Sequence, residues 1–199
     1  MAEIRPARAE DAQLVAPLIY LTSPGGFILF GGSERRGVKL IEAAFSTPGT
    51  DCAREVVTLA ELDGQVAGAM AAFPAIEGEE RRRRFTRLAM RRRPPWRWPR
   101  IAAVARNGAR RSPKPPPDAF YIDALATAEG YRRRGVAEAL LSEAERLARE
   151  NGLEALALDT TVANSPARAL YERFGFEASE EVPASPPIPA LVGYVKRLG

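Results

Sequence analysis

Apolar and polar positions follow two different periods along this chain of 199 residues. Some segments carry apolar residues every three or four positions, the spacing of one helix face, as Val136, Leu140 and Ala144 do. Others are short apolar runs bounded by turn residues, which is typical of buried strands. The predicted helices cover 10–21, 34–45, 136–150 and 166–173, and the predicted strands cover 4–8, 56–61, 65–73, 119–126, 153–161 and 191–198.

Turn and cap residues support several of these boundaries. Leu62-Asp63-Gly64 lies between two strands and contains the Asp-Gly pair of tight hairpins. Asn151-Gly152 predicts a helix end, and Asn164 or Ser165 predicts an N-cap. The stretch TSPGGFILFGG, 22–32, predicts a glycine-rich loop.

The order of the elements indicates the fold class. The strand at 119–126, the helix from Val136 and the strand at 153–161 form a βαβ unit, which requires parallel strands and a right-handed crossover. The remaining strands and helices alternate without internal repeats. We therefore expect an α/β (α+β) fold in one domain over 1–199, because this length suits a single well-filled core.

The amino-acid composition limits the class of protein and the catalytic groups that are available to it. The hydrophobic content of 46% and the charged content of 27% are ordinary for a soluble globular protein. The sequence shows neither a membrane-length apolar run nor a signal-peptide pattern, so we expect a cytoplasmic protein. Cys52 is the single cysteine, and the lack of histidine excludes imidazole bases and the commonest zinc ligands. We expect no metal site.

Basic charge is concentrated in one segment. Residues 81–114 hold 14 of the 29 Lys and Arg residues and no Asp or Glu. Aromatic residues such as Trp96 and Trp98 lie among these arginines, a mixture that could bind phosphates, acidic ligands or nucleic acid. The alternative is a solvated helix and loop, and we interpret 77–117 as a basic insertion in the domain.

Three arginines precede the helix that begins near Gly135. The N-terminus of a helix carries about half a positive charge, so Arg132, Arg133 and Arg134 stand in an unfavourable field. A bound phosphate would accept hydrogen bonds from free N–H groups there and pair with the arginines. The pattern is neither GxGxxG nor a nucleotide-hydrolase phosphate loop, and a solvated corner remains the alternative.

These segments together resemble a known family. Residues 120–176 resemble the GNAT (GCN5-related) N-acetyltransferase family, whose acyl-CoA signature R/Q-x-x-G-x-G/A is met by Arg132, Gly135 and Ala137. Glu129-Gly130 stands where the family often has Pro followed by Glu. The resemblance covers most of the chain outside 77–117, and its second motif comprises Asn164, Ala167, Leu170, Tyr171, Gly175 and Phe176.

The resemblance implies a GNAT fold and an acetyl-CoA site. The implied fold is a mixed sheet of six to seven strands flanked by helices, with parallel strands 4 and 5 splayed apart. The pantetheine arm of CoA would lie between these strands, the pyrophosphate would lie on the backbone of 133–138, Asn164 would reach the pantetheine and Tyr171 would stand near the sulfur. The implied cofactor-binding residues are Leu125, Ala126, Thr127, Arg132, Arg133, Arg134, Gly135, Val136, Ala137, Glu138, Asn164, Ala167 and Tyr171.

The implied reaction is acetyl transfer from acetyl-CoA to a primary amine of a small molecule or peptide. A backbone N–H near Leu125 would stabilise the oxyanion, and Tyr171 is our candidate acid. Asp123 is our candidate base, because a carboxylate within an apolar strand needs a reason; a buried structural Asp is the alternative.

The sequence leaves other points open. The acceptor cannot be identified, and a homodimer is compatible with the sequence. The chain could also be a CoA-binding module without catalysis, or a nucleic-acid-associated protein that uses the arginine-rich segment.

Overall fold

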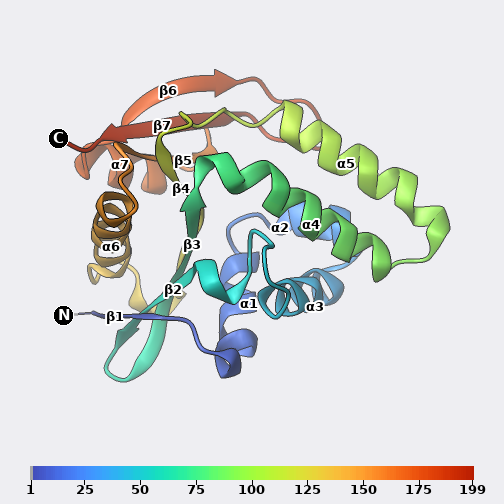
Figure 1. Cartoon of the computed structure of the whole chain (residues 1–199), viewed down its shortest axis with the longest axis horizontal. Helices are drawn as coiled ribbons and strands as arrows, with labels where there is room; N and C mark the ends of the chain where they lie inside the picture. The colour runs from blue at the N-terminus through green and yellow to red at the C-terminus, as the bar shows by residue number, and fades with distance from the viewer. Residues whose placement is uncertain (1) are drawn as a thin grey trace.

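A computed structural model describes residues 2–199 as one mixed seven-stranded sheet with helices on both faces (Figure 1). The strand order is β1-β2-β3-β4-β5-β7-β6. The strands are β1 Glu3–Pro6, β2 Val57–Leu62, β3 Gln65–Pro74, β4 Ala119–Thr127, β5 Ala155–Thr161, β6 Glu177–Val182 and β7 Leu191–Arg197. The helices are α1 Ala12–Tyr20, α2 Pro24–Gly31, α3 Glu34–Phe45, α4 Gly78–Arg91, α5 Trp98–Arg110, α6 Val136–Glu150 and α7 Ser165–Arg173.

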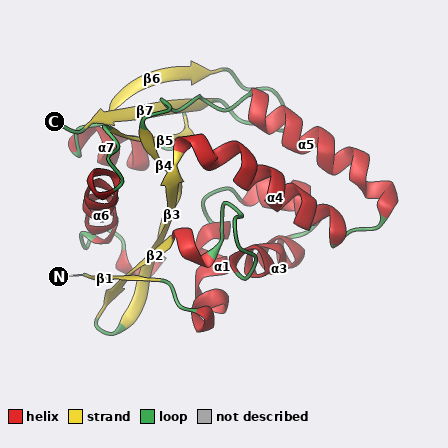
Figure 2. Cartoon of the chain, in the orientation of Figure 1, coloured by secondary structure: helices red, strands yellow, loops and turns green. Residues whose placement is uncertain are grey.

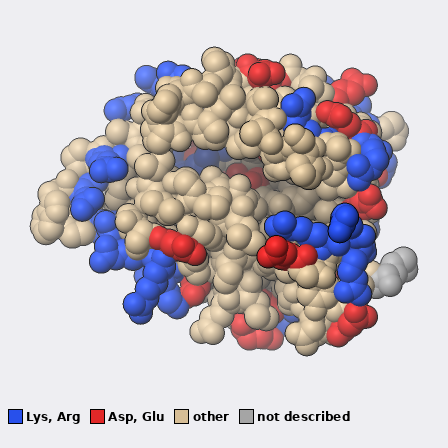
Figure 3. Space-filling model, turned by 180° about the vertical axis from the view of Figure 1, so that it is seen from behind, with Lys and Arg blue, Asp and Glu red and all other residues tan. Residues whose placement is uncertain are grey.

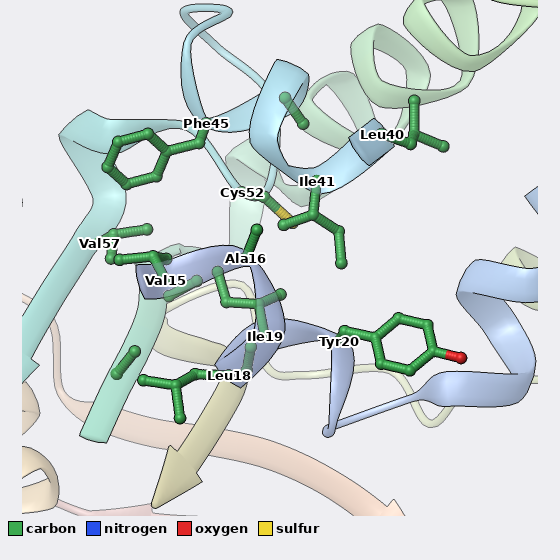
Figure 4. Packing of buried hydrophobic residues seen from close by; sticks show 14 of the residues in the cluster. Val15, Ala16, Leu18, Ile19, Tyr20, Leu40, Ile41, Phe45, Cys52 and Val57 are labelled. Carbon is green, nitrogen blue, oxygen red and sulfur yellow. The ribbon is translucent and has the colours of Figure 1, made fainter. Parts of the chain in front are cut away.

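The helices divide into two groups on opposite sides of the sheet (Figure 2). Helices α6 and α7 pack on one face through an apolar cluster that includes Leu140 and Tyr171; we call this the α6 face. Helices α1 to α5 cover the other face, the α1 face, where Phe45 and Phe85 join one cluster. Figure 4 shows Cys52 in that cluster beside α1 and α3, and its side chain is buried.

The β2–β3 hairpin confirms its sequence signal. Asp63 and Gly64 both have positive φ, 55° and 72°, as a two-residue type I′ turn requires. Helix α3 begins and ends at the residues expected from its periodicity, with Ser33 as N-cap. Asn164 caps α7 by accepting a hydrogen bond from the Ala167 N–H, so the N-cap prediction is also correct.

The parallel strands β4 and β5 separate halfway along their length. Their register pairs run from Ala119 with Ala155 to Ile122 with Leu158 and end there. Beyond that point β4 pairs only with β3, and β5 pairs only with β7. The prediction of splayed parallel strands is therefore confirmed, and residues 123–127 of β4 have one edge without a neighbouring strand.

A β-bulge coincides with the start of this splay. Ala71 and Ala72 are consecutive on β3, but their partners on β4 are Ala124 and Ile122, which leaves Asp123 as the extra residue. A bulge leaves its extra residue unpaired and can redirect the side chain. The aspartate that interrupts the apolar strand thus stands at the point where β4 leaves β5.

Three elements of the structure were not predicted from the sequence. The stretch 22–32, predicted as a loop, contains helix α2, whose Phe27 packs against Phe85 with ring centroids 6.2 Å apart. Tertiary packing outweighs the low helix propensity of its glycines. The basic insertion contains two helices, α4 and α5, rather than one helix and a loop. Strand β6 was not predicted because it is a mostly exposed edge strand with no apolar alternation.

The structure also bears on membrane association. Across residues 2–199, no single helix has both the length and the apolar composition needed to cross a membrane. The segments Ala9–Tyr20 and Pro24–Gly31 meet the criterion only together, and they bend by 113° at their junction.

Candidate active site

The first turn of α6 offers free backbone donors beside the splay. Gly135 is the N-cap residue with φ 79°, and no side chain within 2–199 caps this helix end. A Cβ built on Gly135 would meet no atom within 4 Å, so space lies in front of the turn. Arg133 also has a positive φ, 60°. Alternating backbone handedness of this kind forms concavities that bind anions, which fits the predicted phosphate position.

The three arginines of this turn are exposed, and they differ in their surroundings. Arg134 forms an ion pair of 3.0 Å with Asp63 of the β2–β3 turn and lies over the Tyr131 ring, 5.4 Å from its centroid. Arg132 and Arg133 form no ion pair with any described residue of 2–199. These two are therefore the better candidates to pair with a phosphate, because a ligand need not displace an existing partner.

Residues of the second predicted motif, Asn164 and Ala167, lie at the start of helix α7. The Asn164 side chain caps the helix and also donates from Nδ2 to Thr160 Oγ1 at 3.1 Å. Its amide thus bridges β5 and α7 where the splay lies, with one N–H still available. Ala167 is the residue whose N–H is capped, so its place in the motif has a structural reason.

Tyr171 lies in the core of the α6 face. Its side chain is 7% exposed, and its ring packs against Phe176 and Tyr194 at 5.9 and 5.8 Å between centroids. Burial, followed by the nearby Asp159 charge, raises the pKa of Tyr171 to about 12. The hydroxyl is therefore protonated at neutral pH, the state that a proton donor needs, although it is a weaker acid than an ordinary phenol. Both sequence interpretations of Tyr171, core residue and acid, are compatible with this position.

Two aspartates mark the start of the splay. Asp123 follows Ile122 on β4, and Asp159 follows Leu158 on β5, so each is the first residue after the last register pair. Asp159 accepts a hydrogen bond of 2.5 Å from the Tyr121 hydroxyl. Asp123 has no side-chain hydrogen bond to any of residues 2–199 and is half-buried. The interpretation of Asp123 as a hydrogen-bonded structural carboxylate therefore loses support.

A third carboxylate approaches this pair from the loop after α3. Asp51 is 9% exposed, and its Oδ1 atom is buried without a hydrogen-bond partner among the residues that the structure describes. Burial raises the pKa of Asp51 to about 6. Burial and the Asp51 charge raise the pKa of Asp123 well above its usual range, and the positive charge of Arg82 opposes this rise. Burial also raises the pKa of Asp159, and the Tyr121 hydrogen bond opposes that change.

Four residues of this charged group around Asp123 were not predicted from the sequence: Asp51, Asp159, Tyr121 and Arg82. One signal was readable, because Asp159 ends the apolar run LALD just as Asp123 interrupts FYID. Asp51 and Arg82 lie far from Asp123 in sequence, in a loop and on α4, and belong to no recognisable motif.

Figure 3 shows a hollow in the middle of the rear face, with basic and acidic atoms at its floor.

The groups on the two sides of the splay can bind different kinds of ligand. One side of the splay presents backbone donors suited to an anion, and the other presents carboxylates suited to a cation or to a proton released near neutral pH. An unpaired strand edge connects the two sides and could pair with an extended polar chain.

The sequence is similar to that of known acetyltransferases. The model of the acetyltransferase (GNAT) family matches residues 35–176. An aminoglycoside N(6′)-acetyltransferase type 1 of Serratia marcescens is 33% identical over 76 residues, which cover 38% of this chain and 49% of that protein. The N-alpha-acetyltransferase MAK3 of Arabidopsis thaliana is 41% identical over 56 residues, 28% of this chain and 30% of that protein. The chain thus matches half or less of the length of these relatives.

The fold has counterparts among solved structures. An N-acetyltransferase from Staphylococcus aureus Mu50 superposes with a TM-score of 0.74 and 21% identity, covering 98% of this chain and 100% of that one. A further acetyltransferase superposes with a TM-score of 0.69 and 22% identity over 99% of this chain and 100% of that chain. At this level of identity the likeness shows the fold.

Proposed function

The chain belongs to the GNAT acetyltransferase family, and on that premise we propose that it transfers an acetyl group from acetyl-CoA to a primary amine. The observation that carries this proposal is the splay of β4 and β5 beside the uncapped first turn of α6. An extended pantetheine chain suits the free β4 edge, and a pyrophosphate suits the helix N-terminus.

The residues proposed to hold acetyl-CoA come from three neighbouring elements, β4, α6 and α7. Leu125, Ala126 and Thr127 lie on the part of β4 that pairs only with β3. The backbone of 133–138, with the open space at Gly135, would receive the pyrophosphate, and Arg132 and Arg133 would supply positive charge. The amide of Asn164 would contact the pantetheine from the α7 side.

Acetyl-CoA supplies the activated acetyl group, and the chain supplies the proton-transfer groups. Asp123 would take up the proton released by the attacking amine, because it is half-buried, has no side-chain hydrogen bond to residues 2–199, and has a pKa that burial and the Asp51 charge raise well above its usual range. Tyr171 would hold the proton that the departing sulfur needs. A backbone N–H near Leu125 would stabilise negative charge on the carbonyl oxygen.

The acceptor is proposed to be an amine of a small molecule or a peptide. The carboxylates Asp51, Asp123 and Asp159 on the α1 face favour a cationic group there. One relative is named an aminoglycoside N(6′)-acetyltransferase and the other an N-alpha-acetyltransferase, and we propose an aminoglycoside amine and an α-amino group as candidate acceptors for this chain. A cytoplasmic location stays a prediction from sequence.

An acetyl-CoA turnover assay tests the proposal. The protein is mixed with acetyl-CoA and a panel of aminoglycosides, polyamines and short peptides, and thiol release is measured. We expect release with at least one amine that exceeds the rate of acetyl-CoA hydrolysis. Acetyl-CoA binding without release for any acceptor would instead favour a CoA-binding module.

A further inference from the structure

A separate pocket lies between α2 and α5. Its volume is about 230 Å³, and it shares no lining residue with the β4–β5 splay. Its apolar lining residues are Ile28, Leu29, Phe30 and Ile101. Its charged lining residues are Arg93, Arg97 and Arg100. Both the basic insertion and the stretch predicted as a glycine-rich loop thus contribute to one cavity.

The arginines of this pocket differ from those at the start of the insertion. On α4, Arg84 and Arg87 form ion pairs with Glu80 at 3.1 and 3.5 Å. Arg93, Arg97 and Arg100 have no ion-pair partner anywhere in residues 2–199. Arg84 and Arg87 therefore fit the interpretation of a solvated helix face with paired charges, whereas the pocket arginines bring positive charge without a carboxylate.

The positive charge of the pocket has no carboxylate partner among residues 2–199, and it is partly buried at Arg93, whereas Arg97 and Arg100 are exposed. Burial lowers the pKa of the half-buried Arg93, and the positive charges of Arg36 and Arg97 lower it further. Like charges that lie close together repel one another, and an anion bound among them would reduce this repulsion.

The local backbone holds Arg93 at this position. Gly32, just after α2, has φ 81°, and a Cβ at Gly32 would lie 2.7 Å from Nη2 of Arg93. The glycine therefore makes room for the guanidinium against the end of α2. The Trp98 indole N–H donates to the carbonyl oxygens of Met90 and Arg93, at 2.8 and 3.1 Å, and so fixes the backbone between α4 and α5.

We propose that this pocket binds an oxyanion of the phosphate class. Guanidinium groups present paired N–H donors that match phosphate oxygens, and three arginines without an ion-pair partner among residues 2–199 line this one pocket. The volume of about 230 Å³ is below the range of roughly 300–1,000 Å³ typical of sites for drug-sized ligands. The pocket therefore fits a single phosphate-bearing group with a short apolar portion rather than a large ligand.

The two tryptophans of the chain provide a readout that is independent of acetyl transfer. Trp96 and Trp98 flank Arg97, and they are the only tryptophans in the sequence. Their fluorescence can be followed while inorganic pyrophosphate is titrated into the full-length protein in the presence of saturating CoA, at constant ionic strength. We expect a saturable change in emission.

A matched pair of variants assigns the response to the pocket. Arg93→Gln with Arg100→Gln should weaken pyrophosphate binding by about tenfold or more, because hydrogen bonds between charged groups are lost. Arg83→Gln with Arg87→Gln removes the same charge from ion-paired positions on α4 and should bind like the wild type. If the first variant fails to fold, the single change Arg100→Gln, at an exposed position, should still weaken binding in the same direction.

Three results would overturn the proposal. They are a response that grows linearly without saturation, equal weakening in both double variants, and a response to duplex DNA without any response to pyrophosphate. The last result would identify the segment as a nucleic-acid surface. Loss of acetyl transfer would leave the fluorescence titration unchanged, so the two proposals fail separately.

Discussion

The two faces of the β4–β5 splay are built in different ways. The proposed acetyl-CoA residues come from one stretch, 125–171, and lie on the free edge of β4, in the turn before α6 and in the first turns of α6 and α7. On the α1 face, the charged groups come from a loop, from α4 and from both strands, with Asp51 and Arg82 far from Asp123 in sequence. The residues of the proposed acetyl-CoA site are thus close together in sequence. The charged residues on the α1 face are far apart in sequence and are brought together by folding.

This difference has a functional consequence. A cofactor that is the same for every member of a family can be held by backbone geometry, which short motifs specify. An acceptor that differs between enzymes must be recognised by side chains on variable loops and insertions. We therefore expect changes on the α6 face to affect acetyl-CoA binding, and changes on the α1 face to affect the chemical step or the acceptor.

The largest effect is expected at Gly135. Gly135→Glu places a carboxylate at the proposed pyrophosphate position, so acetyl-CoA should no longer raise the melting temperature in a thermal-shift assay. The new Cβ would meet no neighbouring atom, and the left-handed φ should cost only about 1–2 kcal/mol of stability. Gly135→Asn is the matched control, because Asn tolerates this φ without adding charge, and it should retain most of the binding. Full acetyl-CoA stabilisation of folded Gly135→Glu would place the pyrophosphate elsewhere.

Asp123 is expected to affect the rate and not the cofactor. Asp123→Asn keeps the side-chain size but removes the proposed base, so kcat should fall by about 10²–10⁴-fold at nearly constant acetyl-CoA affinity. The wild-type rate should also rise with pH through a pKa above the usual carboxyl range, and the variant should lose this dependence. Asp118→Asn, at an exposed ion pair with Arg197, should behave as the wild type. A normal rate for Asp123→Asn would exclude Asp123 as the base.

Tyr171 should show a smaller loss, and it separates the two sequence interpretations of this residue. Tyr171→Phe keeps the ring packing, so a core role predicts an unchanged rate, and an acid role predicts a decrease in kcat of about 10²-fold. Tyr194→Phe is the control, since its hydroxyl bonds with Arg168 and Glu172 and should affect stability alone. The rates must be compared in single turnovers, because slow product release can hide the chemical step.

The smallest effect concerns stability on the α1 face. The folded-state pKa of Asp51, about 6, lies above the unfolded value near 3.8, so folding favours its protonated form. The stability that this group contributes is present below about pH 4 and is lost as the pH rises through 6. Asp51→Asn should therefore be more stable than wild type at pH 7.5, by about 1–3 kcal/mol, and the difference should vanish at pH 4. Urea unfolding at both pH values measures it, and an equal difference at both would contradict the assignment.

The same contrast explains what could be predicted from sequence. The bounds of α3, the β2–β3 turn and the Asn164 cap follow from local periodicity and cap residues, and all three are confirmed. Helix α2 could not be predicted, because its glycines disfavour a helix and packing of Phe27 on the insertion decides the outcome. The approach of Asp51 to Asp123 depends on long-range packing, which no spacing in the sequence records.

The most direct test of the account is residue-resolved amide hydrogen exchange along β4, with and without CoA. Residues 120–122 pair with both β3 and β5, whereas residues 124–127 pair only with β3, so the strand contains its own control. We predict that CoA slows exchange of those amides in 123–127 that point away from β3 and leaves 120–122 unchanged. Unchanged exchange across 123–127 in protein saturated with CoA would contradict binding of the pantetheine arm in the splay.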